Sequence, residues 1–383
     1  MEICQGHRDV VLDRDPDGVT PELFEPIHVE TPGPPLTQRT NSIRILILSD
    51  TFSAESAQIS FAAAISYNAV AGSSFLLLDL GIRTGYAVYI NVHHGERSNL
   101  RLIRFGSPAE EKPGLLLQDG TRVDASALGA DYDEAFFAGG GLRELEKWSQ
   151  DHSSSAPRVP ASLRLGSPIC RPSKIVCIGL NFRDHAAESK MDLPKEPVLF
   201  FKSTTALVGP NDRLRIPRNA TKVDWEVELA VVIGSKASYI PKEEALTHVA
   251  GYVLHNDYSE RSFQLERGGQ WVKGKSADTF APLGPFLATP NEIPNPGSLA
   301  MWLKVNGESR QNSSTANMIF DVATLVSYVS DFMTLLPGDV ISTGTPAGVG
   351  LGMNPPSYLR AGDVVELGIE GLGESRQEVV EFQ

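Results

Sequence analysis

Short apolar runs separated by Gly, Pro, Asn and Asp dominate the chain from residue 163 to its end. Typical runs are KIVCIGLN, VELAVVIG, VAGYVLHND, MWLKVNG and GDVVELGIEG. Runs of this length between turn-forming residues predict β-strands joined by short loops. The alternation of strands with long helices that marks a doubly wound parallel sheet is missing. The pattern therefore predicts an α+β fold dominated by β-structure.

From residue 102 onward, helices are expected only in short segments. These cover residues 142–148, 183–189, 242–248 and 322–332. Between residues 102 and 126, the pair Asp119-Gly120 separates two apolar runs, which is typical of a hairpin turn. The Ser-rich piece at 153–160 predicts a linker.

The chain changes character near residue 100. Lysine is absent before Lys112, and the stretch 13–35 mixes acids, prolines and glycine without any period, which predicts disorder. A short strand at 43–48 and a helix at 53–71 are the elements expected in this head. We therefore divide the chain into three parts. Residues 1–100 are expected to form a partly disordered extension, residues 101–165 a small β-rich module with its linker, and residues 166–383 the main domain.

Composition narrows the class of protein. The net charge of -13 over 383 residues argues against a nucleic-acid partner, because binding to phosphates draws on clustered Lys and Arg. The three cysteines form neither a disulfide framework nor a CxxC pair, which favours a reducing compartment. No apolar run of membrane-spanning length lacks charge, and the first residues do not resemble a secretory signal. We expect a cytoplasmic protein that binds neither nucleic acid nor membrane.

Three carboxylates form the sharpest candidate site. Glu226 and Glu228 stand two apart at the head of an apolar run, so in a strand they point to the same face. Asp257 ends the next long apolar run. Three hard oxygen donors at two strand ends favour Mg²⁺ or Mn²⁺, with Ca²⁺ as a third option. The more ordinary interpretation of such acids alone is a solvated strand face.

Three further motifs carry polar chemistry. His185 and Glu188 lie three apart in GLNFRDHAAESK, where they form either a general-base pair or an ordinary contact on a helix face. Lys275 lies in a Gly-rich loop and either stabilises negative charge on a substrate or is simply solvated. The segment STGTPAGVG could bind a carboxylate or phosphate through its backbone amides. It matches no nucleotide-binding loop, so no nucleotide cofactor is expected.

Taken together and in this order, the motifs resemble the fumarylacetoacetate hydrolase family. The resemblance covers residues 102–383 and rests on the segments 179–185, 224–228, 256–257, 273–282 and 343–350. It implies a catalytic domain with a mixed β-roll, preceded by a small N-terminal β module, in a protein that is commonly a homodimer. It assigns the metal to Glu226, Glu228 and Asp257, water activation to His185 with Glu188, an active-site role to Lys275, and substrate contacts to Gln264, Gly344 and Thr345.

The resemblance implies a divalent-metal-dependent hydrolase that cleaves a C–C bond in a small 1,3-dicarbonyl (2,4-dioxo) acid and releases pyruvate or a similar oxo-acid. Within the family, the segment 256–285 looks most like bacterial hydrolases of 2,4-dioxo-3-deoxy sugar acids. The alternatives are an oxaloacetate-type decarboxylase, a dienoate isomerase, a lyase like ureidoglycolate lyase and, more remotely, a non-catalytic oxo-acid-binding module. The presence of both members of the His-Glu pair favours hydrolysis. Candidate pocket residues are Phe201, Lys202, Tyr258, Arg261 and Trp271.

Overall fold

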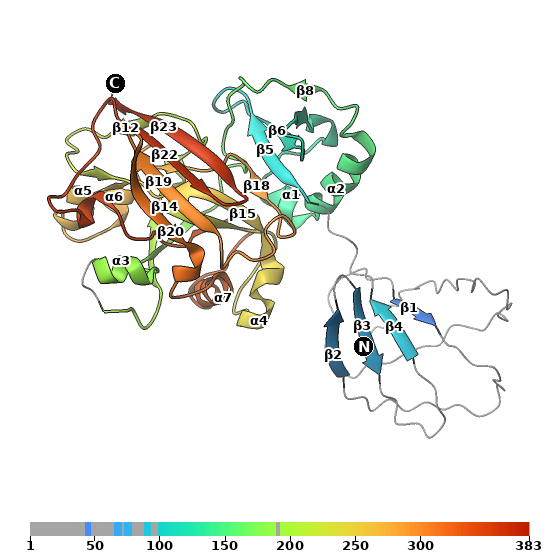
Figure 1. The fold of residues 1–383 in the computed structure, drawn as a ribbon. Coiled ribbons are helices and arrows are strands. Elements are labelled where there is room, and N and C mark those ends of the chain that lie inside the picture. The colour runs from blue at the N-terminus through green and yellow to red at the C-terminus, as the bar shows by residue number, and fades with distance from the viewer. Residues whose placement is uncertain are drawn as a thin grey trace, which may run out of the picture. The chain divides into compact units, whose positions relative to one another are not determined.

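A computed structural model of the chain describes residues 99–188 and 192–382, together with the backbone of four earlier strands (Figure 1). Contacts within the chain separate two units, Met1–Arg97 and Ser98–Gln383. Among the described residues, no helix has the length and apolar character needed to cross a membrane.

The first unit contains an antiparallel sheet with the strand order β1-β4-β3-β2. Its strands are β1 (Ile43–Leu46), β2 (Ile65–Val70), β3 (Ser73–Leu78) and β4 (Val88–Val92). β1 confirms the strand expected at 43–48, whereas β2 shows that the helix expected at 53–71 is wrong over residues 65–70. The sequence ISYNAV is rich in β-branched and aromatic residues, and it pairs with β3. The stretch 13–35, predicted to be disordered, lies outside the described residues.

The second unit is built on a ten-stranded mixed sheet. In spatial order its strands are β10 (Val198–Lys202), β9 (Ile175–Gly179), β21 (Val340–Ser342), β14 (Val227–Ile233), β15 (Val249–Asn256), β18 (Leu287–Ala288), β5 (Arg101–Phe105), β6 (Lys112–Leu116), β7 (Arg122–Asp124) and β8 (Arg158–Val159). Every residue of β14 and β15 is buried, which is why their sequences are apolar except at Glu228, His255 and Asn256.

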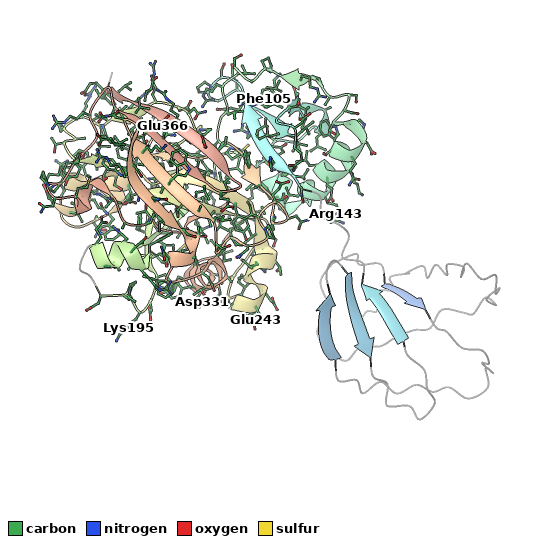
Figure 2. The ribbon with its side chains drawn as sticks, viewed as in Figure 1. Phe105, Arg143, Lys195, Glu243, Asp331 and Glu366 are labelled. Atoms are coloured by element: carbon green, nitrogen blue, oxygen red, sulfur yellow. The ribbon has the colours of Figure 1, made fainter. Side chains whose placement is uncertain are left out.

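The small module consists of β5 to β8 with the helices α1 (Glu134–Ala138) and α2 (Gly141–His152). Phe105 on β5, labelled in Figure 2, is buried in its core. Gly120, in the turn between β6 and β7, has a φ of 83° and confirms the expected hairpin. The linker predicted at 153–160 is wrong in part, because β8 pairs with β7 and buries Val159. Since β5 also pairs with β18, the sheet crosses the expected boundary at residue 165.

A second sheet of five strands packs on the first. Its order is β12 (Leu214–Ile216), β23 (Gly373–Glu381), β22 (Val364–Ile369), β19 (Ala300–Val305) and β20 (Glu308–Ser314). β19, β22 and β23 lie against β14 and β15, as Figure 1 shows. The remaining strands of this unit form two short pairs. β11 (Leu207–Val208) pairs with β17 (Ala281–Pro282), and β13 (Val223–Asp224) pairs with β16 (Ser259–Glu260). This arrangement confirms the expected α+β, β-dominated fold.

The expected short helices are present. The structure forms α2, α3 (Arg183–Glu188), α4 (Lys242–Ala245) with a 3-10 turn after it, and α7 (Val322–Phe332). Three more, α1, α5 (Arg261–Leu265) and α6 (Val272–Lys275), were not predicted, because helices of four or five residues are too short to show helical periodicity. Single 3-10 turns are η1 (Ser126–Leu128), η2 (Thr204–Ala206), η3 (Leu246–His248), η4 (Thr315–Asn317) and η5 (Gly350–Gly352).

Candidate active site

Three buried carboxylates converge where β14 begins and β15 ends. The antiparallel register pairs Glu228 with His255, and the backbone amide of Asp257 donates to the carbonyl oxygen of Glu226 at 2.9 Å. Alternation along both strands therefore places Glu226, Glu228 and Asp257 on the same face of the sheet. One oxygen from each carboxylate lies within 4.8 Å of the other two. The geometry thus gathers the three acids that the sequence singled out.

Three buried cations offset the repulsion between these acids. The ammonium of Lys275 lies between Glu226 Oε2, at 2.6 Å, and Asp257 Oδ2, at 2.8 Å. Lys202 Nζ donates to Asp257 Oδ1 at 2.5 Å. Arg261 Nη2 donates to Glu226 Oε1 at 2.7 Å. Removing any one partner from such a buried set leaves a charge uncompensated in a low-dielectric interior.

The protonation states follow from these contacts. Burial would raise the pKa of Asp257, but the charges of Lys202 and Lys275 outweigh it and hold that pKa below its usual range. For Lys275, burial would lower the pKa, and the charges of Asp257 and Glu226 more than reverse this. Burial raises the pKa of Glu228, and the charges of Asp257 and Glu226 add to the effect. Lys275 is therefore an ammonium and Asp257 a carboxylate.

The donor set of the cluster fits a hard divalent cation. Glu228 Oε2 accepts from Ser342 Oγ at 2.5 Å and from the Gly344 amide at 2.9 Å, which fixes the third carboxylate in place. All three donors are carboxylate oxygens, and neither sulfur nor imidazole belongs to the group. Such donors suit Mg²⁺, Mn²⁺ or Ca²⁺ better than Zn²⁺. A cation here would also relieve the repulsion from Asp257 and Glu226, which adds to the effect of burial on the pKa of Glu228.

The His-Glu pair lies on α3. His185 Nδ1 is 3.2 Å from Glu188 Oε2, as the three-residue spacing predicted. Because a carboxylate only accepts, this contact places the proton on Nδ1 and leaves the Nε2 lone pair free to act as a base. The other oxygen of Glu188 accepts from the backbone amide of Gly348 at 3.0 Å. At the start of α3, Ser313 Oγ donates to Asp184 Oδ2 at 2.6 Å.

One loop touches both groups. We call residues 344–352 the glycine loop, because Gly344, Gly348, Gly350 and Gly352 belong to it. The amide of Gly344 contacts Glu228 in the carboxylate cluster, and the amide of Gly348 contacts Glu188 of the pair. Gly344 and Gly348 have φ values of 98° and 100°, a conformation that favours glycine.

The expected substrate-contacting groups have protein partners. Thr345 Oγ1 donates to the carbonyl oxygen of Val227 at 2.9 Å and accepts from Gln311 Nε2 at 2.8 Å. Gln264 Oε1 accepts from Arg261 Nη1 at 3.1 Å. These bonds hold the glycine loop on β14 and keep Arg261 in place. A direct contact of Gln264, Gly344 and Thr345 with a substrate stays a prediction.

The proposed pocket lining divides between two faces of β10. Phe200 pairs with Cys177, which pairs with Ser342 of the carboxylate face. Phe200 therefore lies on that face, 5.0 Å from Lys275 Nζ to its ring centroid, while Phe201 points away and is 38% exposed. Sequence reasoning chose Phe201 instead of Phe200, although the alternation from Lys202 gives the correct residue.

The other lining candidates follow from the same packing. The ring of Trp271 lies 5.3 Å from that of Phe200, between centroids. Tyr258 is fully buried and donates its hydroxyl to Gln377 Oε1 at 2.8 Å, so its polar group serves the interior. Lys202 and Arg261 bind the carboxylates directly. Sequence reasoning missed Ser342 and Gln311, since only the fold brings their strands beside β14.

Known proteins resemble this chain along the same segment. The profile of the fumarylacetoacetate (FAA) hydrolase C-terminal family matches residues 174–380. A protein of Burkholderia multivorans named as a putative hydrolase is 50% identical over 279 residues, which are 73% of this chain and 98% of that protein.

Solved structures agree. One is a probable 2-hydroxyhepta-2,4-diene-1,7-dioate isomerase of Mycobacterium abscessus, 36% identical with a TM-score of 0.64, covering 75% of this chain and 100% of that one. Another is a maleylpyruvate hydrolase from Sphingobium sp. SYK-6 in complex with manganese(II) and pyruvate, 29% identical with a TM-score of 0.62, covering 74% and 100%. The chain belongs to the fumarylacetoacetate hydrolase family.

Proposed function

We propose that this chain is a divalent-metal-dependent hydrolase that cleaves a C–C bond in a small 2,4-dioxo acid and releases pyruvate or a similar oxo-acid. The observation that carries the proposal is the convergence of three buried carboxylates around Lys275, with a His-Glu pair attached to the same glycine loop. Such a site combines charge stabilisation with a base, and hydrolysis at carbon needs both.

Glu226, Glu228 and Asp257 would hold the cation. When bound, Mg²⁺ or Mn²⁺ supplies Lewis-acid polarisation and a template for the oxygens of the substrate. Manganese is the first ion to test, because the maleylpyruvate hydrolase relative was solved with manganese(II) and pyruvate.

The residues of the chain perform the proton transfers. His185 Nε2 takes a proton from water, while Glu188 holds the other ring nitrogen and stabilises the imidazolium. The water oxygen bonds to the carbonyl carbon distal to the carboxylate, and the C–C bond on the pyruvate side breaks. Its electron pair stays on the pyruvate fragment as an enolate, whose charge the Lys275 ammonium stabilises. The proton on His185 then returns to carbon, so one dioxo acid and one water give one carboxylic acid and one oxo-acid.

A second candidate is a dienoate isomerase, which the Mycobacterium abscessus relative favours through its name. An isomerase acting on a 2-hydroxydienoate would use the same base to take the proton from the enol hydroxyl and return a proton to a carbon further along the chain, with no water consumed. An oxaloacetate-type decarboxylase or a ureidoglycolate lyase-like enzyme would depend less on His185. The product therefore separates these candidates.

We also propose a cytoplasmic homodimer. β10 is the edge strand of the ten-stranded sheet, and it exposes Val198 and Phe201, with Val272 of α6 exposed nearby. An open strand edge beside apolar side chains favours pairing with a second copy. Cys170 and Cys177 are free thiols, which fits a reducing compartment.

The test is a screen of oxo-acids with the purified chain and Mn²⁺ or Mg²⁺. It covers 2,4-dioxopentanoate, a 2,4-dioxo-3-deoxy sugar acid, oxaloacetate and a 2-hydroxydienoate, and scores pyruvate, CO₂ and isomerised product separately. We expect pyruvate from a 2,4-dioxo acid, loss of activity after chelation and recovery on adding Mn²⁺. Turnover that is indifferent to chelation, or CO₂ or isomer as the main product, would contradict the proposal.

A further inference from the structure

Asp224, the last residue of β13, is a buried carboxylate with four donors around it. Its Oδ1 accepts from the backbone amides of Trp225, at 2.8 Å, and Gly350, at 2.6 Å. Its Oδ2 accepts from the amide of Leu351, at 2.9 Å, and from Arg261 Nε, at 2.8 Å. The side chain has no exposed surface, so its carboxylate oxygens are bonded to these four protein donors and not to bulk water.

These bonds lead in two directions. Through Arg261, which also donates to Glu226 at 2.7 Å, Asp224 is connected to the carboxylate cluster. Through the two loop amides it is connected to the glycine loop, whose Gly348 amide donates to Glu188. An unbroken path of hydrogen bonds and backbone therefore runs from the cluster to the His-Glu pair, and Asp224 is its midpoint.

We propose that Asp224 is a positioning residue that keeps the glycine loop against α3 and so aligns the His185-Glu188 pair with the carboxylate cluster. The inference rests on the proposed function, since it takes His185 as the base. Asp224 acts through other groups, and touches neither the reacting atoms nor the carboxylates that would hold the cation.

The packing explains why a small loop movement would matter. A Cβ atom on Gly352 would lie 2.7 Å from Glu188 Cδ, so the loop backbone is in direct contact with that carboxyl group. An amide that donates to a carboxylate makes a charge-assisted bond, which is stronger than one between neutral groups. If the loop drifts away from α3, Glu188 loses the Gly348 amide and the ring of His185 loses its fixed orientation.

The test begins with Asp224→Asn. An amide accepts at one end only, so in either orientation its NH₂ group faces two donors. With 2,4-dioxopentanoate and Mn²⁺, we expect kcat to fall about 100-fold, the scale of a general base, with a smaller change in KM. In a Glu188→Gln background the same change should lower kcat by less than about threefold, because the pair is already broken. If kcat of the double variant Asp224→Asn/Glu188→Gln falls by the product of the two single losses, the proposal is overturned.

Asp339→Asn is the matched control. Asp339 is equally buried and accepts from the amides of Lys174 and Leu336 and from the Lys174 ammonium. None of these partners belongs to the glycine loop or to α3. We expect this variant to lower the melting temperature as Asp224→Asn does, and to change kcat by the same small factor with or without Glu188→Gln.

Hydrogen exchange gives a reading that does not depend on turnover. The peptide covering 183–188 should exchange faster in Asp224→Asn than in Asp339→Asn, and equal rates would overturn the coupling. If instead His185→Ala and Glu188→Gln leave kcat unchanged, the proposed function fails while the exchange result still stands.

Should Asp224→Asn not fold, Leu351→Pro removes one loop amide at a position that is 39% exposed. It should show the same non-additivity with Glu188→Gln, and multiplying losses would again overturn the proposal.

Discussion

The two halves of the site are held in different ways. Glu226, Glu228 and Asp257 sit at the ends of β14 and β15, where the ladder and its register fix them. His185 and Glu188 sit on the six-residue helix α3, with 17% and 21% of their side chains exposed. The first half depends on backbone pairing in the centre of a sheet. The second depends on a few side-chain bonds at the surface.

The difference indicates how each half should respond to substitution. A change among the carboxylates removes a charge from a buried network, so stability and chemistry should fall together. A change in α3 should affect chemistry alone, because so short a helix contributes little to the core. Its other attachments, such as the bond from Arg183 to the carbonyl oxygen of Met318 at 2.6 Å, would keep the helix in place.

The largest expected effect is that of Asp257→Asn. It leaves the buried Lys202 and Lys275 without their shared carboxylate, and removing one partner of a buried pair costs about 3–5 kcal/mol. We expect a lower free energy of unfolding by denaturant and no Mn²⁺ binding by calorimetry. Asp331→Asn, on the exposed side of α7, is the control and should change neither. A wild-type free energy of unfolding in Asp257→Asn would mean that the carboxylate cluster contributes no more to stability than the His-Glu pair does.

The next effect is that of His185→Ala. Loss of the base should lower kcat by about 10²- to 10⁴-fold, while the free energy of unfolding changes by less than about 1 kcal/mol. Calorimetry should give the wild-type affinity for Mn²⁺, since His185 lies outside the cluster. The control is His152→Ala, at the end of α2. A clear loss of Mn²⁺ affinity would mean that α3 and the cluster are one unit.

The strand half could be predicted well from the sequence. Alternation at Glu226 and Glu228 and the end of the run at Asp257 depend only on local geometry, as does α7, which has the expected bounds. Their cationic partners could not be assigned so securely. Lys202 lies on the edge strand β10, and three strands separate β10 from β15 in the order of the sheet. Its Nζ nevertheless donates to Asp257, just after the end of β15. Only the three-dimensional fold brings these residues together.

The glycine loop shows the other limit. Its glycines and threonines suggested a place for a substrate anion, yet Thr345 bonds to Gln311, which comes from β20 of the second sheet. A hydroxyl looks the same in sequence whether it faces a ligand or a buried amide. Residues 65–70 of the helix expected at 53–71 show the same limit, since they form β2, which pairs with β3.

A smaller effect separates the two faces of β10. Phe200→Ala removes the ring beside the Lys275 ammonium, a contact worth about 1 kcal/mol, so kcat/KM should fall about fivefold. Phe201→Ala, one residue on, should leave kcat/KM within about twofold and raise the monomer fraction in sedimentation. Steady-state kinetics on both variants makes the comparison. Equal losses of kcat/KM in the two variants would mean that Phe200 and Phe201 do not face the site and a subunit interface, respectively.

The smallest effect tests α7, which contributes no residue to the carboxylate cluster or to the His-Glu pair. Asp321 caps α7 by accepting from the Thr324 amide at 2.8 Å, and Asp321→Ala should cost about 0.5–2 kcal/mol without changing kcat. Burial raises the pKa of Asp321, but hydrogen bonds from Lys242 and Thr324 outweigh it, so the pKa lies below its usual value. The stabilisation is then complete above the pKa of the unfolded chain and is lost as the pH falls through the folded one. Urea unfolding of both proteins should differ at pH 7 and converge in acid. A constant difference would assign the effect to helix propensity instead of the cap.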